Sequence, residues 1–124
     1  MNTFFFRMLP LATGLFLGSL HTMAQEGDMP PPTPERLKEI KAQGATILDV
    51  RTTGEFAAGH IKGAINIPLD QLANRLNKLP KGKPVITCCL SGGRSGSALS
   101  LLKANGYDAY NGGGWCALER TLEG

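Results

Sequence analysis

Short apolar runs alternate along the chain with segments whose apolar residues recur at helical spacing. The runs predict strands at residues 45–50, 64–67, 84–88 and 107–110. The helical spacing predicts helices at residues 34–44, 69–79 and 95–105, with a further helical turn at 55–58. This alternation is typical of an α/β fold, here a central parallel sheet of about four to five strands with helices on both faces. In such sheets, ligands bind at the carboxyl ends of the strands.

The N-terminal segment differs from this pattern. Arg7 precedes an apolar run at residues 8–20, and small residues at 22–24 fit the preference of a signal peptidase. The run is shorter than the ~20 apolar residues of a membrane-spanning helix, and an uncleaved N-terminal anchor is the alternative to a cleaved leader. We therefore expect a periplasmic protein with no membrane attachment after cleavage. Its expected parts are a signal peptide at 1–24, a proline-rich linker at 25–33 and one domain at 34–124.

Charge and composition exclude one class of partner. The chain has 13 Lys and Arg against 10 Asp and Glu, a net charge of +3 that is scattered along the sequence. Nucleic-acid-binding domains concentrate basic residues on one face, so we expect no nucleic-acid partner. We expect a monomer that acts on small molecules and carries neither a cofactor nor a metal.

Three cysteines, Cys88, Cys89 and Cys116, are an odd number, which in an exported protein leaves at least one thiol unpaired. Cys88 and Cys89 are not expected to pair with each other, because neighbouring residues on a strand point to opposite faces. A disulfide from either of them to Cys116 stays open at this point.

Cys89 lies where a predicted strand gives way to a predicted helix. Gly92 and Gly93 can adopt positive φ angles, so that the N–H groups of the loop point inward around an anion. The start of the helix and the charge of Arg94 favour the thiolate over the thiol. We therefore predict that Cys89 is a nucleophile in an anion-binding loop. The predicted binding residues of this loop are Leu90, Ser91, Gly92, Gly93, Arg94 and Ser95.

Two stretches resemble the signatures of rhodanese-homology domains. The first stretch comprises residues 47–56 and 59–68 (ILDVRTTGEF and GHIKGAINIP), and the second comprises residues 89–95, 106–107 and 112–115 (CLSGGRS, GY and GGGW). The resemblance covers residues 34–119, and the whole is similar to periplasmic single-domain rhodaneses of the phage-shock type.

The resemblance implies a rhodanese-like fold and a thiosulfate sulfurtransferase activity. The Cys89 thiolate would take sulfane sulfur from thiosulfate or a persulfide donor, hold it as a persulfide and pass it to a thiophilic acceptor, cyanide or a thiol. Some thiosulfate-using members of the family place a basic residue just after the cysteine, where this chain has Leu90 and Ser91. That difference leaves room for a persulfide donor.

Four further side chains have two interpretations each. Arg51 follows a predicted strand and is expected to bind substrate, with a local network around Asp49 as the alternative. Arg94 is expected to serve the loop, with a salt bridge at the helix start as the alternative. Cys88 is expected to be a buried apolar residue, and Cys116 departs from the family pattern; each has the alternative role of a resolving thiol.

Loop length separates sulfur transfer from phosphate chemistry. Five residues lie between Cys88 and Arg94, the spacing of cysteine phosphatases, and four lie between Cys89 and Arg94. The shorter loop leaves room for a sulfur atom and little more, so phosphatase or arsenate reductase activity is less favoured. The main alternative to an enzyme is a non-catalytic module that binds sulfur or an anion, or that senses redox state.

Overall fold

The computed structural model describes residues 30–124. The predicted signal peptide and residues 25–29 of the predicted linker lie outside this range. The strands are β1 (Thr46–Asp49), β2 (Ile65–Asn66), β3 (Val85–Cys89) and β4 (Ala109–Gly114). The helices are α2 (Pro34–Ala42), α3 (Thr53–Ala58), α4 (Leu69–Leu72), α5 (Gly93–Ala104) and α6 (Trp115–Glu123), with a 3-10 turn, η1 (Leu76–Lys78). Within residues 30–124, no helix is long and apolar enough to cross a membrane.

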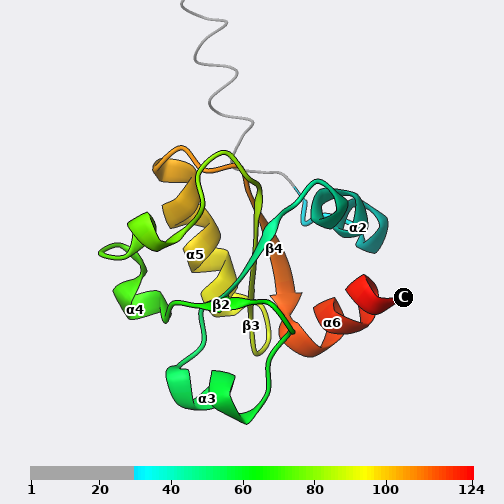
Figure 1. The fold of residues 1–124 in the computed structure, drawn as a ribbon, viewed down its shortest axis with the longest axis horizontal. Helices are drawn as coiled ribbons and strands as arrows, with labels where there is room; N and C mark the ends of the chain where they lie inside the picture. The colour runs from blue at the N-terminus through cyan, green and yellow to red at the C-terminus, as the bar shows by residue number, and fades with distance from the viewer. Residues whose placement is uncertain (1–29) are drawn as a thin grey trace, which may run out of the picture. The chain divides into compact units, whose positions relative to one another are not determined.

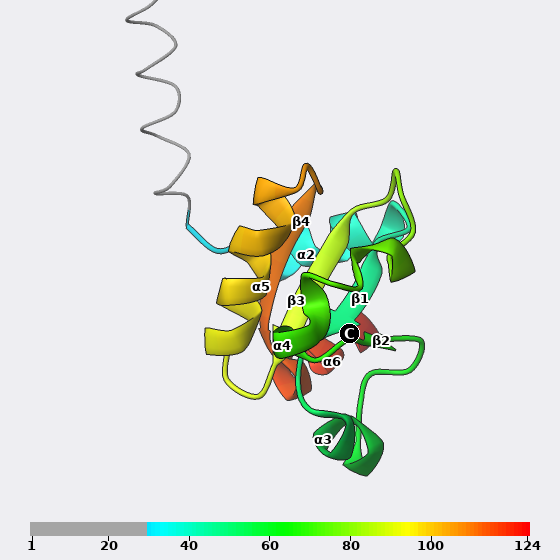
Figure 2. The same ribbon diagram turned by 90° about the vertical axis from the view of Figure 1, so that its left-hand side faces the viewer.

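The four strands within residues 30–124 are parallel and lie in the order β2-β1-β3-β4. Figure 1 shows α4 and α5 on one face of this sheet and α2 and α6 on the other. The prediction of a parallel α/β sheet covered on both faces is therefore confirmed. The short helix α3 lies apart from both layers, beyond the carboxyl ends of the strands (Figures 1 and 2).

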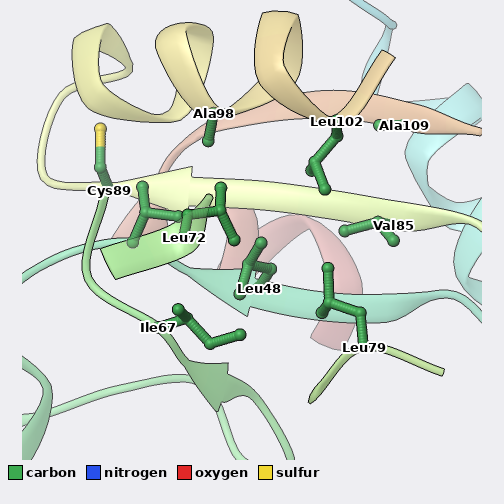
Figure 3. Close-up of a cluster of buried hydrophobic side chains, with 10 residues drawn as sticks. Leu48, Ile67, Leu72, Leu79, Val85, Cys89, Ala98, Leu102 and Ala109 are labelled. Atoms are coloured by element: carbon green, nitrogen blue, oxygen red, sulfur yellow. The ribbon is translucent and has the colours of Figure 1, made fainter. Parts of the chain in front are cut away.

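The alternation of side chains along β3 divides the core in two. Val85 and Cys89 belong to the cluster under α5, together with Leu102, whereas Ile86 and Cys88 belong to the cluster under α2 and α6. Figure 3 shows the first cluster, with Cys89 at the tip of β3 and its sulfur turned toward the first turn of α5. Because successive residues of a strand point to opposite faces, the two adjacent cysteines have different surroundings.

The predicted helix at 69–79 is wrong in its length. Leu72 and Leu79 are buried in the core, as the spacing predicts, but the backbone leaves the helical region at Arg75, where φ is −128°. The helix stops after Leu72 and the chain resumes as η1, because the leucines can reach the core without a continuous helix between them.

The C-terminal region also differs from the sequence prediction. The last strand extends to Gly114, four residues beyond the predicted end at Tyr110, and α6 follows it directly. Glycine is unfavourable in strands, so the run at 112–114 does not indicate the last part of β4 in the sequence. Helix α6 is anchored by Leu118, which is 1% exposed.

Candidate active site

The nucleophile predicted from sequence lies at the carboxyl end of β3 and is almost enclosed. Cys89 is 1% exposed, and its Sγ accepts a hydrogen bond from the Gly92 N–H at 3.0 Å. This contact depends on Gly92, which takes φ +107° as the N-cap residue of α5. Since a left-handed backbone angle strongly favours glycine, the loop sequence directly determines the orientation of this donor.

The surroundings of Cys89 stabilise its thiolate. Burial alone raises the pKa of Cys89, but hydrogen bonds from the Ser95 hydroxyl and from the backbone of Ser95, Gly92 and Ser91 outweigh burial and lower the pKa below the ordinary 9.0. The sulfur also faces the N-terminal end of α5, where the helix dipole favours negative charge. These contacts therefore favour the thiolate of Cys89 without a partner base.

Cys88 has the opposite character. It is fully buried on the other face of the sheet, and burial together with the charge of Asp49 raises the pKa of Cys88 to about 12. Phosphatase activity would require Cys88 as the nucleophile. Its position on the other face of the sheet and its raised pKa both oppose that role. All three cysteines of the chain are free, so the open question of a disulfide to Cys116 is answered in the negative.

Ser95 connects the nucleophile to β4. The Ser95 Oγ lies 3.4 Å from Cys89 Sγ, 3.0 Å from Gly92 O and 2.7 Å from Asn111 Oδ1. A hydroxyl has one proton to donate. When Cys89 is a thiol, that proton is directed to Asn111 or Gly92, and when Cys89 is a thiolate it can turn to the sulfur.

Asn111 is a site residue that the sequence prediction missed. Its Oδ1 accepts the Gly113 N–H at 2.9 Å, and its Nδ2 donates to Gly92 O at 3.4 Å. The register between β3 and β4 shifts between Thr87 and Cys89, so that β4 contains one extra residue opposite the loop. The feature of the sequence that could have indicated Asn111 is its position as a polar residue at the end of the strand that lies next to the nucleophile.

Two glycines allow β4 to pass close to the loop. A Cβ at Gly114 would lie 2.8 Å from Leu90 O, and a Cβ at Gly112 would lie 2.8 Å from Thr87 O. Glycine is therefore required at these two positions, because any side chain would collide with the backbone of β3 or of the loop.

Arg94 does not reach into the loop. Its Nη1 and Nη2 donate to Glu55 Oε1 and Oε2 at 2.7 and 3.0 Å, so the guanidinium is directed toward α3. The alternative interpretation, a salt bridge at the helix start, is the one that the structure adopts. The positive potential of the loop then comes mainly from its N–H groups.

The expectation that Arg51 binds substrate is not met by the geometry. Arg51 is 3% exposed and makes hydrogen bonds of 2.7 to 3.1 Å with the Asp49 carboxylate, with a further bond of 2.7 Å to Gly59 O. Its guanidinium also lies over the ring of Trp115 at 4.7 Å. Asp49 and Trp115 lie with Cys88 on the side of the sheet opposite Cys89, so Arg51 serves the local network instead.

The rest of the loop is open. Leu90, Ser91 and Gly93 are exposed, and Leu90 is 62% exposed. The site is therefore a nearly enclosed sulfur beneath an accessible loop. Within residues 30–124, no group of His, Cys, Asp and Glu side chains is arranged to hold a metal ion.

We expect the Ser95→Ala variant to have a higher pKa at Cys89. Without the Ser95 hydroxyl, fewer hydrogen bonds offset the rise in the pKa of Cys89 that burial causes, so the thiolate fraction at neutral pH falls. A hydrogen bond contributes about 1 kcal/mol, which corresponds to a roughly fivefold slower reaction below the pKa. The measurement is the pH profile of iodoacetamide alkylation at Cys89, with Ser97→Ala, an exposed change on the same helix, as the control. A Ser95→Ala profile that superimposes on the wild-type profile would contradict this role.

The structure is a parallel α/β domain in which the turn between β3 and α5 surrounds a buried cysteine, and comparisons with known proteins agree with this fold. The family model for the rhodanese-like domain matches residues 33–118. The chain therefore belongs to the rhodanese-like domain family, as the sequence resemblance predicted.

Individual relatives support the same family. The chain is 35% identical over 89 residues to the thiosulfate sulfurtransferase GlpE of Pseudomonas fluorescens, covering 71% of this chain and 82% of that protein. It is 48% identical over 68 residues to the uncharacterized protein YqhL of Bacillus subtilis, and spans 54% of the length of each. A solved rhodanese-like domain protein from Staphylococcus aureus superimposes with a TM-score of 0.62 at 34% identity, covering 73% of this chain and 91% of that one. The chain is thus related to sulfurtransferases.

Proposed function

We propose that this protein is a sulfurtransferase that carries sulfane sulfur on Cys89. The observation that carries the proposal is the hydrogen bonding of Cys89 Sγ by the Gly92 N–H and Ser95, which lowers the pKa of a buried thiol. Relatedness to a thiosulfate sulfurtransferase gives it independent support.

In the first half-reaction, the Cys89 thiolate attacks the outer sulfur of the donor. The S–S bond of the donor breaks and its electron pair leaves with sulfite, if the donor is thiosulfate, or with a thiolate, if the donor is a persulfide. The outer sulfur stays on Cys89 as a persulfide. Inward N–H groups, including that of Gly92, stabilise the negative charge before and after the transfer.

In the second half-reaction, a thiophilic acceptor attacks the terminal sulfur of the persulfide. The bond between that sulfur and Cys89 breaks, and the electron pair returns to Cys89 as its thiolate. Cyanide leaves as thiocyanate, and a thiol leaves as a new persulfide. Neither half-reaction requires a histidine base at the loop, because the hydrogen bonds to Cys89 lower its pKa and favour the thiolate.

The test is sulfur transfer by the purified protein. We expect thiocyanate to form from cyanide with thiosulfate or with an alkyl persulfide as the donor. Lack of thiocyanate with both donors, from protein whose Cys89 still reacts with iodoacetamide, would instead favour the non-catalytic binding module.

We also propose that the protein works in the periplasm after removal of its leader, on the basis of the pattern in residues 1–24. We further propose that it is a monomer. Protein expressed with its own N-terminus should then begin at Gln25 in the periplasmic fraction. Recovery of an intact chain in the membrane fraction would support the uncleaved anchor, and a dimeric mass by light scattering would contradict the monomer.

A further inference from the structure

We propose that Asn111 is a positioning residue that holds the Ser95 hydroxyl proton while Cys89 is a thiol and releases it to the sulfur when Cys89 ionises. Asn111 belongs to β4, outside the loop, and acts on the nucleophile through Ser95. The inference deepens the proposed function, on which it rests, because it identifies a residue that controls the charge of the nucleophile.

The backbone fixes the orientation of the Asn111 side-chain amide. The Gly113 N–H donates to Asn111 Oδ1 at 2.9 Å, and Asn111 Nδ2 donates to Gly92 O at 3.4 Å. A flipped amide would place two donors face to face at Gly113 and two acceptors face to face at Gly92. The atom that lies 2.7 Å from Ser95 Oγ is therefore an oxygen, which can only accept the hydroxyl proton.

In the thiol form, the protons of the site are donated in one direction. The Cys89 S–H donates to Ser95 Oγ at 3.4 Å, and the Ser95 hydroxyl donates in turn to Asn111 Oδ1 at 2.7 Å. Its other acceptor, Gly92 O, is more distant at 3.0 Å. The bond to Asn111 therefore stabilises the thiol form of Cys89.

Ionisation of Cys89 leaves one hydroxyl proton among three acceptors. The thiolate is the charged acceptor, and charge-assisted hydrogen bonds are roughly twice as strong as neutral ones. When the hydroxyl turns to the sulfur, Asn111 Oδ1 keeps the Gly113 N–H as its donor. Gly92 O keeps the Gly96 N–H at 3.0 Å. The hydroxyl can therefore turn without leaving a buried acceptor unpaired, which would be costly.

Other charges near the nucleophile do not replace this hydroxyl. Arg94 of α5 is paired with Glu55, and Cys88 stays protonated because burial raises its pKa to about 12. Asp49 of β1 and Tyr110 of β4 lie with the cluster on the opposite face of the sheet. The acidic residue of α4, Asp70, is exposed. A shift in the pH profile of the nucleophile therefore reports on the hydrogen bonds to its sulfur.

Two substitutions of Asn111 should shift the pKa of Cys89 in opposite directions. Asn111→Asp gives the Ser95 proton a charged acceptor, so the pKa should rise by about one unit and alkylation below the pKa should become roughly tenfold slower. Asn111→Ala removes the acceptor, so the pKa should fall and alkylation below it should become about fivefold faster. The measurement is the pH profile of iodoacetamide alkylation, followed on the Cys89 peptide by mass spectrometry so that the exposed Cys116 does not contribute.

A matched control and a double variant make the test specific. Asn77→Asp places the same charge at an exposed position of η1 and should leave the profile unchanged. In a Ser95→Ala background, the shift caused by Asn111→Asp should be at most about half as large, because the hydroxyl that transmits it is absent. Thermal unfolding shows which variants are folded, and either Asn111 variant tests the inference without the other.

Three results would overturn the inference: profiles of both Asn111 variants that superimpose on the wild-type profile, shifts of both variants in the same direction, or an undiminished shift in the Ser95→Ala background. A purely structural perturbation would give one of the last two. Alkylation needs no sulfur donor, so its result is separate from the thiocyanate assay, whose failure would overturn only the proposed function.

Discussion

Replacing Cys89 with serine is expected to abolish sulfur transfer, because a hydroxyl at this position is not ionised at neutral pH and cannot form a persulfide. Cys88→Ala should retain activity, since Cys88 is buried on the other face of the sheet with a pKa of about 12. Cys116→Ser should also retain activity, because that thiol is exposed and free. The measurement is thiocyanate formation from cyanide with thiosulfate or an alkyl persulfide as the donor.

Thermal unfolding of each variant provides the control, since loss of activity is informative only in a folded protein. Activity in folded Cys89→Ser protein would refute the assignment of the nucleophile. Loss of activity in folded Cys88→Ala protein would instead indicate Cys88 as the nucleophile. The loop would then have the longer spacing that is typical of cysteine phosphatases.

The second large effect is expected on stability. Asp49→Asn should destabilise the fold by about 3–5 kcal/mol, because it leaves the buried Arg51 guanidinium without its counter-charge. For a domain of this size, we expect the melting temperature to fall by more than ~10 °C. The measurement is thermal or urea unfolding of the variant beside the wild-type protein.

Two comparisons make this prediction specific. The exposed Arg36–Glu39 pair is the matched control, and Glu39→Gln should leave the melting temperature nearly unchanged, because exposed ion pairs contribute little to stability. Replacing both members of the buried pair, as Asp49→Leu with Arg51→Met, should cost less than Asp49→Asn alone, because no unpaired charge stays buried. If the Arg51→Met protein were stable but had a raised KM for its donor, Arg51 would bind the donor rather than stabilise the fold.

The parts of the site that could be predicted from sequence are local in the chain. A strand, a glycine-containing turn and a helix start follow one another within a few residues, and glycine at position 92 is required by its φ of +107°. The nucleophile and the inward N–H groups follow from that succession. The alternation of strands and helices is also a local pattern, and it allowed the parallel sheet to be predicted.

The parts that could not be predicted depend on contacts between distant segments. The partner of Arg94 is Glu55, 39 residues away, and nothing near Arg94 in the sequence indicates that contact. Arg51 follows a strand that ends at the same edge of the sheet as the Cys89 loop. Its side chain, however, packs with residues of the face opposite Cys89. Asn111 reaches Ser95 and Gly92 because β4 pairs with β3 with Asn111 opposite Thr87, and this register is not apparent in the sequence.

The most direct test of the central claim is the mass of the protein after exposure to a sulfur donor. A persulfide on Cys89 adds ~32 Da, and peptide mapping should place this gain on Cys89 alone. Addition of cyanide should then remove it. A loss of ~2 Da, from a disulfide between two of the cysteines, would contradict sulfur transfer and favour a redox-sensing role.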